Sequence, residues 1–438
     1  MPHVARWLTG LATSLVGNQI YLVALSWVAV QTTTPANVGW ILVAGAIPQA
    51  ALLLLGGVFV DRLGPKRIII ASDLLRTLVM VVFALVVSTG ATTALLLGAL
   101  SVVFGIVDGF FLPAISTAPR YLAGREAMTR LMAAKTMVAR GAEFAGSPLA
   151  SWLLIAASAA AAFWANAVLF AVSVVALAAT RMVLPTDDAG PGGQAIADTS
   201  SAAPTGPAPE PPGPVQEPTG VWTELVAGAR LILRERTLAN LLVVVFVMEL
   251  GFAGPMTAGV PLLAKETGWG VGAVGWILGG FGVGAAVAAG LLAWRKDVAR
   301  AGLAVVAGLT AMGLSVVLIG VVPVFGLSPA VSGVLAGALG VTAGIGSGFF
   351  GTLVSAAVLQ LAPTDQIGRV MSALSFSSLT AVPIGFALTG LITGEAGAQV
   401  PFLLGGALVL AAATLAGTNK QVRLLTMEPA PVRETAGV

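Results

Sequence analysis

Val38-Gly-Trp-Ile-Leu42 is repeated without change as Val274-Gly-Trp-Ile-Leu278, at an offset of 236 residues (274 − 38). A second segment, Gly105-Ile-Val-Asp-Gly-Phe-Phe111, returns as Gly344-Ile-Gly-Ser-Gly-Phe-Phe350 at an offset of 239 (344 − 105). A third, looser match further along keeps the same offset. Matches that stay in register indicate that the two halves of the chain repeat one fold. Shared composition is the alternative explanation.

The residues around these repeats are much more apolar than those of a soluble protein. The chain of 438 residues is 57% hydrophobic and 9% charged, with a mean hydropathy of +0.96, whereas soluble domains carry about 25% charged residues. About 20 apolar residues cross a bilayer as a helix. Such runs fall at 7–31, 38–60, 67–89, 94–118, 128–156, 160–182, 237–260, 271–294, 300–322, 330–358, 369–393 and 399–417.

The sequence therefore predicts an all-α membrane protein with twelve transmembrane helices in two pseudo-symmetric six-helix bundles. Each half has an even number of helices, so the two halves have the same orientation. The predicted domains are an N-terminal bundle (1–184), a disordered cytoplasmic linker (185–220), an amphipathic surface helix (221–236), a C-terminal bundle (237–418) and a cytoplasmic tail (419–438). The linker contains nine prolines, which is typical of a segment that builds no core.

Lysine and arginine gather in alternate loops, which places both termini in the cytoplasm. Lys265 is the exception, because it follows a helix on the opposite side. The isoelectric point near 9.6 could indicate nucleic-acid binding. The basic residues stand at the ends of apolar runs, however, so we expect the lipid bilayer and no nucleic acid as a partner.

Composition also excludes most catalytic chemistry. The chain has no cysteine, and its only histidine is His3 near the N-terminus. This excludes disulfides, cysteine nucleophiles and a zinc site. No nucleotide-binding loop of the type G-x-x-x-x-G-K-[ST] occurs. We expect no enzyme activity, no metal and no cofactor, and an ion gradient as the energy source. The expected partners are a small-molecule substrate and protons, and the expected state is a monomer.

The loop after the second apolar run reads Gly57-Val-Phe-Val-Asp61-Arg62-Leu-Gly64-Pro-Lys66-Arg67. It resembles the signature loop of the major facilitator superfamily, G-x-x-x-D-R-x-G-x-[KR]-[KR]. Asp73 and Arg76 follow at a spacing that resembles the drug and siderophore exporter branch of that family. The resemblance implies that this loop, with Asp73 and Arg76, gates the conformational change. The alternative is that the loop only anchors the topology.

The fifth apolar run contains Gly146 and Pro148 within Gly141-Ala-Glu-Phe-Ala-Gly-Ser-Pro-Leu-Ala150. This stretch resembles the antiporter motif of the same family, G-x-x-x-G-P-x-x-G-G, although a serine separates Gly146 from Pro148. The resemblance favours export. The alternative is a glycine–proline kink that merely bends the helix.

Ionisable residues are costly inside a membrane and need a reason to be there. Near the middle of predicted helices stand Asp108, Arg140, Glu143 and Glu249. In the family that the chain resembles, helices 1, 4, 7 and 10 line a central cavity. The resemblance therefore implies that Asp108 faces the cavity as a proton or cation-substrate site.

Other polar residues are weaker candidates for the same cavity. Glu249 is the second carboxylate, and Asn18 and Gln19 lie at a similar depth in the first helix. The alternative for Asp108 is a structural pair with an arginine. Arg140 and Glu143 are one turn apart and neutralise each other, unless Arg140 instead approaches Asp108 as a coupling switch.

Together these observations predict a secondary active transporter of the bacterial inner (cytoplasmic) membrane. The expected activity is export of amphipathic or lipophilic small molecules, drug-like or siderophore-like, by proton antiport with alternating access. The alternative is a proton-coupled symporter or facilitator that imports a small metabolite.

Overall fold

The computed structural model describes residues 2–180, 182, 236–294, 300–361 and 367–423. The first half contains α1 (Pro2–Thr32), α2 (Pro35–Leu63), α3 (Pro65–Ser88), α4 (Ala94–Thr117), α5 (Arg125–Ala156) and α6 (Ala159–Ala178), with a short turn η1 (Ala118–Tyr121) before α5. The predicted linker and nearly all of the predicted surface helix lie outside the described residues, as does the tail beyond residue 423.

The second half contains α8 (Arg236–Gly254), a π-helical turn η3 (Pro255–Gly259), α9 (Val260–Glu266), α10 (Gly270–Trp294), α11 (Ala301–Val321), η4 (Val322–Phe325), α12 (Pro329–Leu361), α13 (Ile367–Ala396), α14 (Val400–Thr418) and α15 (Lys420–Arg423). α8, η3 and α9 form one continuous rod, so the described residues contain six long helical segments in each half. The rod continues six residues beyond the predicted end at residue 260.

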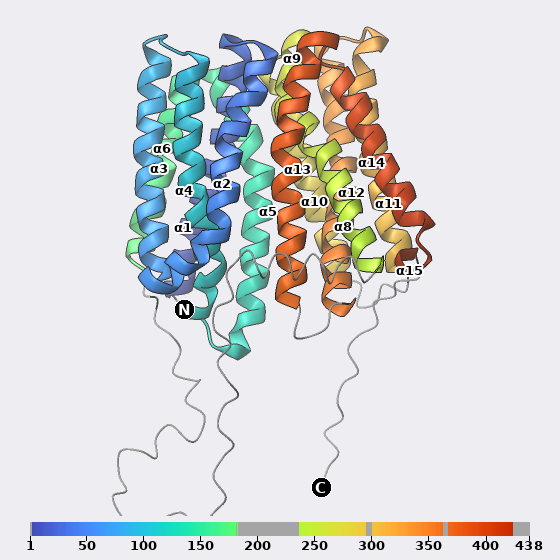
Figure 1. The fold of residues 1–438 in the computed structure, drawn as a ribbon. Helices are drawn as coiled ribbons and strands as arrows, with labels where there is room; N and C mark the ends of the chain where they lie inside the picture. The colour runs from blue at the N-terminus through green and yellow to red at the C-terminus, as the bar shows by residue number, and fades with distance from the viewer. Residues whose placement is uncertain (1, 181, 183–235, 295–299, 362–366, 424–438) are drawn as a thin grey trace, which may run out of the picture.

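Figure 1 shows two upright bundles side by side, α1–α6 in one and α8–α14 in the other. By length and composition, eleven helices of the described chain can cross a membrane. α5 is the remaining long helix, and its sequence is richer in charge. It carries Arg125, Glu126, Arg130, Lys135, Arg140 and Glu143. α1 begins and α15 ends at the same end of the bundles (Figure 1). We call this the terminal side and the opposite end the distal side.

The sequence repeat reappears as a repeat of packing contacts. A Cβ on Gly105 would lie 2.0 Å from the carbonyl oxygen of Gly45, and a Cβ on Gly344 would lie 2.0 Å from that of Phe281. Gly344 and Phe281 are the positions that the two repeat offsets assign to Gly105 and Gly45. Equivalent glycines thus let α4 approach α2 and α12 approach α10 in the same way, as close helix contacts in membranes require.

We expect Gly105→Ala to lower the free energy of unfolding by about 1–3 kcal/mol, because the added methyl group forces α4 away from α2. Thermal unfolding of the purified protein in detergent would measure this. Gly98→Ala is the matched control on the same helix, because nothing lies within 4 Å of its added Cβ. Equal melting temperatures for the two variants would contradict this account.

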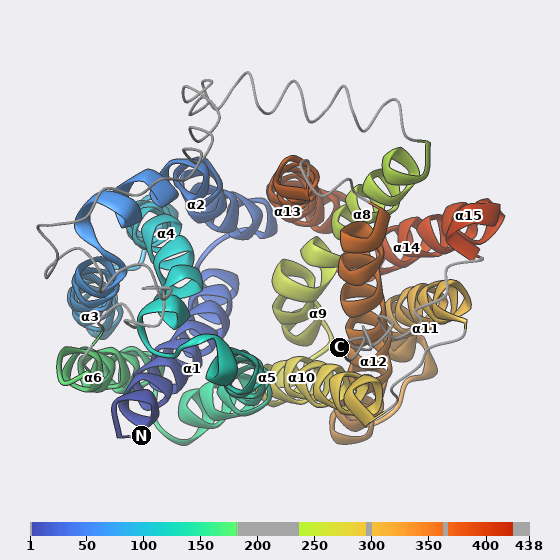
Figure 2. The same cartoon turned by 90° about the horizontal axis from the view of Figure 1, so that it is seen from below.

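The two bundles touch each other through the distal half of the molecule. Gly39 of α2 packs on the backbone of Gly390 in α13, and Gly275 and Gly279 of α10 pack on Pro148 of α5. Figure 2 shows α2 beside α13 and α5 beside α10. At the terminal end of α2, Asp61 and Arg62 are exposed. The described structure is therefore closed on the distal side.

Candidate functional site

Two cavities lie between the bundles. One, of about 260 Å³, is lined by α1, α2 and α4 and is closed by Val382 and Phe386 of α13. The other, of about 190 Å³, is lined by α1 and α5 and by α8, η3, α9 and α10 of the second bundle. We call them the α4-side and α5-side cavities. Leu22 and Thr257 line both, and Thr257 is carried by the π-helical turn, a feature that often marks functional sites.

The α4-side cavity carries a cluster of polar groups. Asn18, Gln49, Ser101 and Asp108 line it together with Tyr21. The Tyr21 hydroxyl donates to Ser101 Oγ at 3.4 Å, and the Tyr21 ring stacks on Phe104 with 3.7 Å between centroids.

The α5-side cavity is more apolar. Phe252, Met256, Leu278 and Phe281 form much of its wall, and its polar groups are Gln19, Ser26, Thr257, Glu143 and Ser147. None of the described residues that line either cavity is basic.

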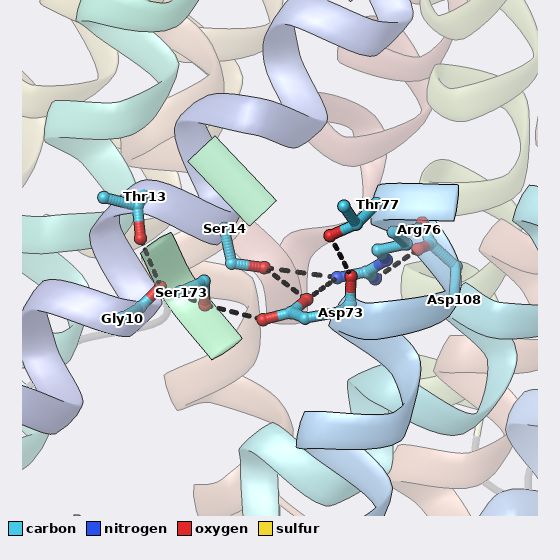
Figure 3. Close-up of polar contacts among 8 residues, drawn as sticks. All are labelled: Gly10, Thr13, Ser14, Asp73, Arg76, Thr77, Asp108 and Ser173. Atoms are coloured by element: carbon cyan, nitrogen blue, oxygen red, sulfur yellow. Dashed lines mark hydrogen bonds and ion pairs between the residues drawn. The ribbon is translucent and has the colours of Figure 1, made fainter. Parts of the chain in front are cut away.

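Behind the α4-side cavity lies a buried ion-pair network (Figure 3). Arg76 of α3 donates from Nη2 to Asp108 Oδ1 and from Nη1 to Asp73 Oδ1 at 3.0 Å. Its guanidinium lies 3.8 Å from the centre of the Phe111 ring, within cation–π distance. The side chains of Arg76 and Asp73 are 1% and 0% exposed, and that of Asp108 is 9% exposed.

The two carboxylates of this network differ in their surroundings. Asp73 accepts hydrogen bonds from Ser14 Oγ at 2.9 Å and from Ser173 Oγ at 2.6 Å in addition to its bond from Arg76. Asp108 accepts only from Arg76 among the described residues, and it lines the cavity. Asp73 is thus enclosed by three donors, whereas Asp108 has one donor and faces the cavity.

The alternative for Asp108, a pair with an arginine, is present, and the partner is Arg76. The idea that Arg140 approaches Asp108 is wrong for this conformation. Arg140 Nη1 instead lies 2.7 Å from Glu143 Oε2, one turn away on α5, and the two side chains are 39% and 31% exposed. The reason is geometric, because α3 packs directly against α4, so a side chain on α3 reaches Asp108.

The other sequence candidates are distributed over the two cavities. Asn18 lines the α4-side cavity, and Gln19 and Glu143 line the α5-side cavity. Glu249 is partly buried in α8 but lines neither cavity. The roles of these residues in binding or coupling stay predictions.

The lining of these two cavities matches the expected set of helices only in part. α1, α4 and the α8–η3–α9 rod contribute to the lining, as the family resemblance implied. α12, the tenth long segment, contributes none of the described lining residues, whereas α2, α5, α10 and α13 do. α12 packs closely against α10 at Gly280, Gly340 and Gly344, where an added Cβ would meet the backbone of the other helix.

Sequence reasoning missed Ser14 and Ser173, and it did not foresee the ion pairs of Asp73 and Arg76. It grouped Asp73 and Arg76 with the gating loop, but both lie in the buried middle of α3. A signal was available, because both are ionisable residues within an apolar run, as Asp108 is. Ser14 and Ser173 carried no comparable signal, because they are two of many serines in apolar helices.

The signature loop makes contacts within its own bundle. Gly64 has φ = 80°, a left-handed backbone that glycine adopts without strain. Lys66 Nζ donates to the carbonyl oxygens of Ala178 and Thr180 at 3.0 and 2.7 Å, and so caps the end of α6. Asp61 has no ion pair with any described residue, and the gating role of the loop remains a prediction.

Gly146 and Pro148 serve as packing positions on α5. A Cβ on Gly146 would lie 2.6 Å from Gln19 Cβ of α1, and Pro148 contacts Gly275 and Gly279 of α10. α5 therefore touches both bundles at this point. This contact is compatible with an antiporter motif and with a simple packing role.

Lys265, the exception to the charge pattern, joins the bundles on the distal side. Its Nζ donates to the carbonyl oxygen of Val30, in the last turn of α1. That carbonyl has no partner within its own helix, and a cation is favoured at a helix C-terminus. The neighbouring Glu266 accepts from the backbone nitrogen of Ala398 at 2.8 Å within its own bundle.

We expect Lys265→Ala to favour opening of the distal side, because a hydrogen bond from a charged donor stabilises by about 1.5–3 kcal/mol. The closed-to-open ratio would fall by on the order of tenfold or more. The chain has no native cysteine, so labelling of a single Ser26→Cys by a membrane-impermeant maleimide from the distal side would measure it. Lys265→Arg is the control, and equal labelling in all backgrounds would refute the expectation.

The bundles, the cavities between them and the buried charge facing one cavity define a secondary-transporter architecture. The family model of the major facilitator superfamily matches residues 7–337 and, in a second match, residues 241–431. The chain belongs to the major facilitator superfamily, and this assignment supports a transporter that is not an enzyme.

Solved structures agree on the fold. A single-residue mutant of the nucleoside transporter NupG is similar with a TM-score of 0.69 at 14% identity, covering 95% of this chain and 99% of that chain. The human organic anion transporter MFSD10 (TETRAN) gives a TM-score of 0.61 at 16% identity over 95% and 99% of the two chains. No curated protein matches the chain in sequence.

Proposed function

We propose that this transporter exports amphipathic or lipophilic small molecules in exchange for protons. The observation that carries the proposal is Asp108, a carboxylate that is held by a single arginine on the wall of the α4-side cavity. This cavity adjoins the more apolar α5-side cavity. Such a cavity suits a solute with a large apolar surface. A single carboxylate on the wall of the α4-side cavity can bind the proton that crosses the membrane in exchange for the solute.

We assign the exchanged proton to Asp108 because Arg76 keeps other hydrogen-bond partners when Asp108 is protonated. If Asp108 is protonated, Arg76 still has Asp73 Oδ1 at 3.0 Å and Ser14 Oγ at 3.2 Å as partners. If Asp73 were protonated instead, a fully buried carboxyl would lose the ionised form to which three donors are directed. Protonation of Asp108 therefore destabilises the fold less than protonation of Asp73.

The proposed topology sets the side of the membrane that each end of the bundles faces. With both termini in the cytoplasm of a bacterium, the terminal side faces inward, and the distal contacts close the cavity to the outside. Alternating access then requires the distal contacts of Lys265 and Gly39 to break while contacts form near Asp61. The drug and siderophore branch stays part of this proposal.

Import of a small polar metabolite is the second candidate. Asn18, Gln49 and Ser101 supply hydrogen-bonding groups in the α4-side cavity, and such groups suit a polar solute. The similar structures include a nucleoside transporter, although at 14% identity that likeness concerns the fold.

Direction separates the two candidates. The full chain in proteoliposomes, with an internal pH dye, is exposed to lipophilic drugs and to nucleosides under an imposed pH gradient. For export we expect drug-dependent proton movement opposite to drug movement, and raised drug tolerance when an efflux-deficient host expresses the chain. Proton and solute movement in the same direction, with a nucleoside as the solute, would favour import.

A further inference from the structure

We infer that the α4-side cavity binds the ammonium end of a lipophilic amine, with Asp108 as its ion-pair partner, while the α5-side cavity holds the apolar end. The inference rests on the proposed function and specifies the class of solute that is exported.

The first argument is charge. The described residues that line the two cavities include the carboxylates of Asp108 and Glu143 and no basic group. Glu143 is already paired with Arg140 at 2.7 Å. In the buried network, the single positive charge of Arg76 faces two carboxylates, Asp73 and Asp108. One negative charge is therefore uncompensated when both are ionised, and a low-dielectric site with such a charge favours a cation.

The second argument is that Arg76, the cation nearest to Asp108 among the described residues, is out of reach of a solute. Arg76 is 1% exposed and is not among the residues that line the cavity. The rings of Phe104, Phe111 and Phe170 lie 5.5, 3.8 and 5.5 Å from its guanidinium carbon. An organic anion entering the cavity would meet Asp108 before Arg76. The geometry therefore disfavours anions.

The third argument is the supply of acceptors. One oxygen of Asp108 accepts from Arg76, and the other has no hydrogen-bond partner among the described residues. The side-chain oxygen of Asn18 also lacks a described partner. Gln49 and Ser101 line the same cavity. An alkylammonium group has three donors, and the stacked Tyr21 and Phe104 rings add an aromatic wall that is favourable for a cation.

The fourth argument is the shape of the site. Leu22 and Thr257 belong to both cavities, which places the charged and apolar regions side by side. Phe252 and Phe281, with centroids 5.4 Å apart, stand in the wall of the α5-side cavity. A solute with an ammonium group at one end and an aromatic body at the other matches this arrangement.

The test compares 3-(1-naphthyl)propylamine with 3-(1-naphthyl)propanol by calorimetric titration of the purified full chain in detergent. The two probes have nearly the same apolar body and differ in charge. We expect the amine to bind the wild type on the order of tenfold more tightly than the alcohol. In Asp108→Asn the ratio should fall to about one, with alcohol binding retained as evidence of an intact cavity. Glu395→Gln, at an exposed carboxylate of α13 that lines neither cavity, should keep the wild-type ratio.

The pH dependence gives a second readout. A proton and an ammonium group compete for the same carboxylate, so amine affinity should rise with pH, by up to about tenfold per pH unit while Asp108 is mostly protonated. The titratable and charged groups that face Asp108 are Arg76 and Asp73 of α3 and Tyr21 of α1. The dependence should vanish in Asp108→Asn.

Equal binding of amine and alcohol by the wild type would overturn the inference, and so would an amine preference that survives in Asp108→Asn or is lost in Glu395→Gln. These outcomes are distinct from failure of the proposed function. Drug-driven proton flux without amine preference would overturn only the present inference. An amine preference without proton flux for any solute would overturn only the proposed proton exchange.

Discussion

Replacing Arg76 by methionine is expected to lower the free energy of unfolding by about 3–5 kcal/mol, because it leaves buried carboxylates without their counter-charge. Asp73 would keep only its serine donors, and Asp108 would lose its one described partner. Methionine preserves most of the side-chain volume, so the loss reports charge and hydrogen bonding more than packing. Thermal unfolding in detergent, together with the yield of monodisperse protein, would measure it.

Arg140→Met is the matched control. The same chemical change at Arg140 removes a half-exposed pair with Glu143, and exposed pairs contribute at most about 1 kcal/mol. Adding Asp108→Asn to Arg76→Met should recover part of the lost stability, because one unpaired carboxylate is then neutral. If Arg76→Met and Arg140→Met unfold at the same temperature, the buried network does not hold the first bundle together.

Much of the fold was predictable because the bilayer imposes simple rules. A helix must be about 20 apolar residues long to cross it, and the predicted run 94–118 matches α4 at Ala94–Thr117. The repeat between Gly105 and Gly344 predicted equivalent packing in the two halves, and the two close approaches are equal. The end of the α8–η3–α9 rod was predicted too early, because Pro261 and Lys265 look like a helix end but lie within or at the end of the rod.

The site was predictable only in part. The cost of a charge in lipid singled out Asp108, whereas its partner depends on which helices pack together, and hydropathy does not encode that. The sequence indicated Arg140 as a possible partner, but the contact of α3 with α4 brings Arg76 to Asp108 instead. Glu249 shows the converse, because it met the same criterion of a charge in an apolar helix and yet lines neither cavity.

Asp108→Asn is expected to abolish uphill transport while leaving downhill movement intact. If one proton is exchanged for one molecule of a neutral solute, a pH difference of one unit supplies about 1.36 kcal/mol. That free energy supports about a tenfold solute gradient. An asparagine cannot release a proton, so the gradient reached by the variant should fall to about one. The measurement is solute accumulation in proteoliposomes under an imposed pH difference.

Two controls separate coupling from folding in that experiment. Downhill movement of the same solute should persist within a few-fold, because the cavity and the pairing of Arg76 with Asp73 do not require a charge on Asp108. Glu143→Gln, which neutralises the other carboxylate on the cavity wall, should still accumulate solute. Accumulation by Asp108→Asn at the wild-type level would remove Asp108 from the coupling step. Loss of accumulation in Glu143→Gln alone would move that step to α5.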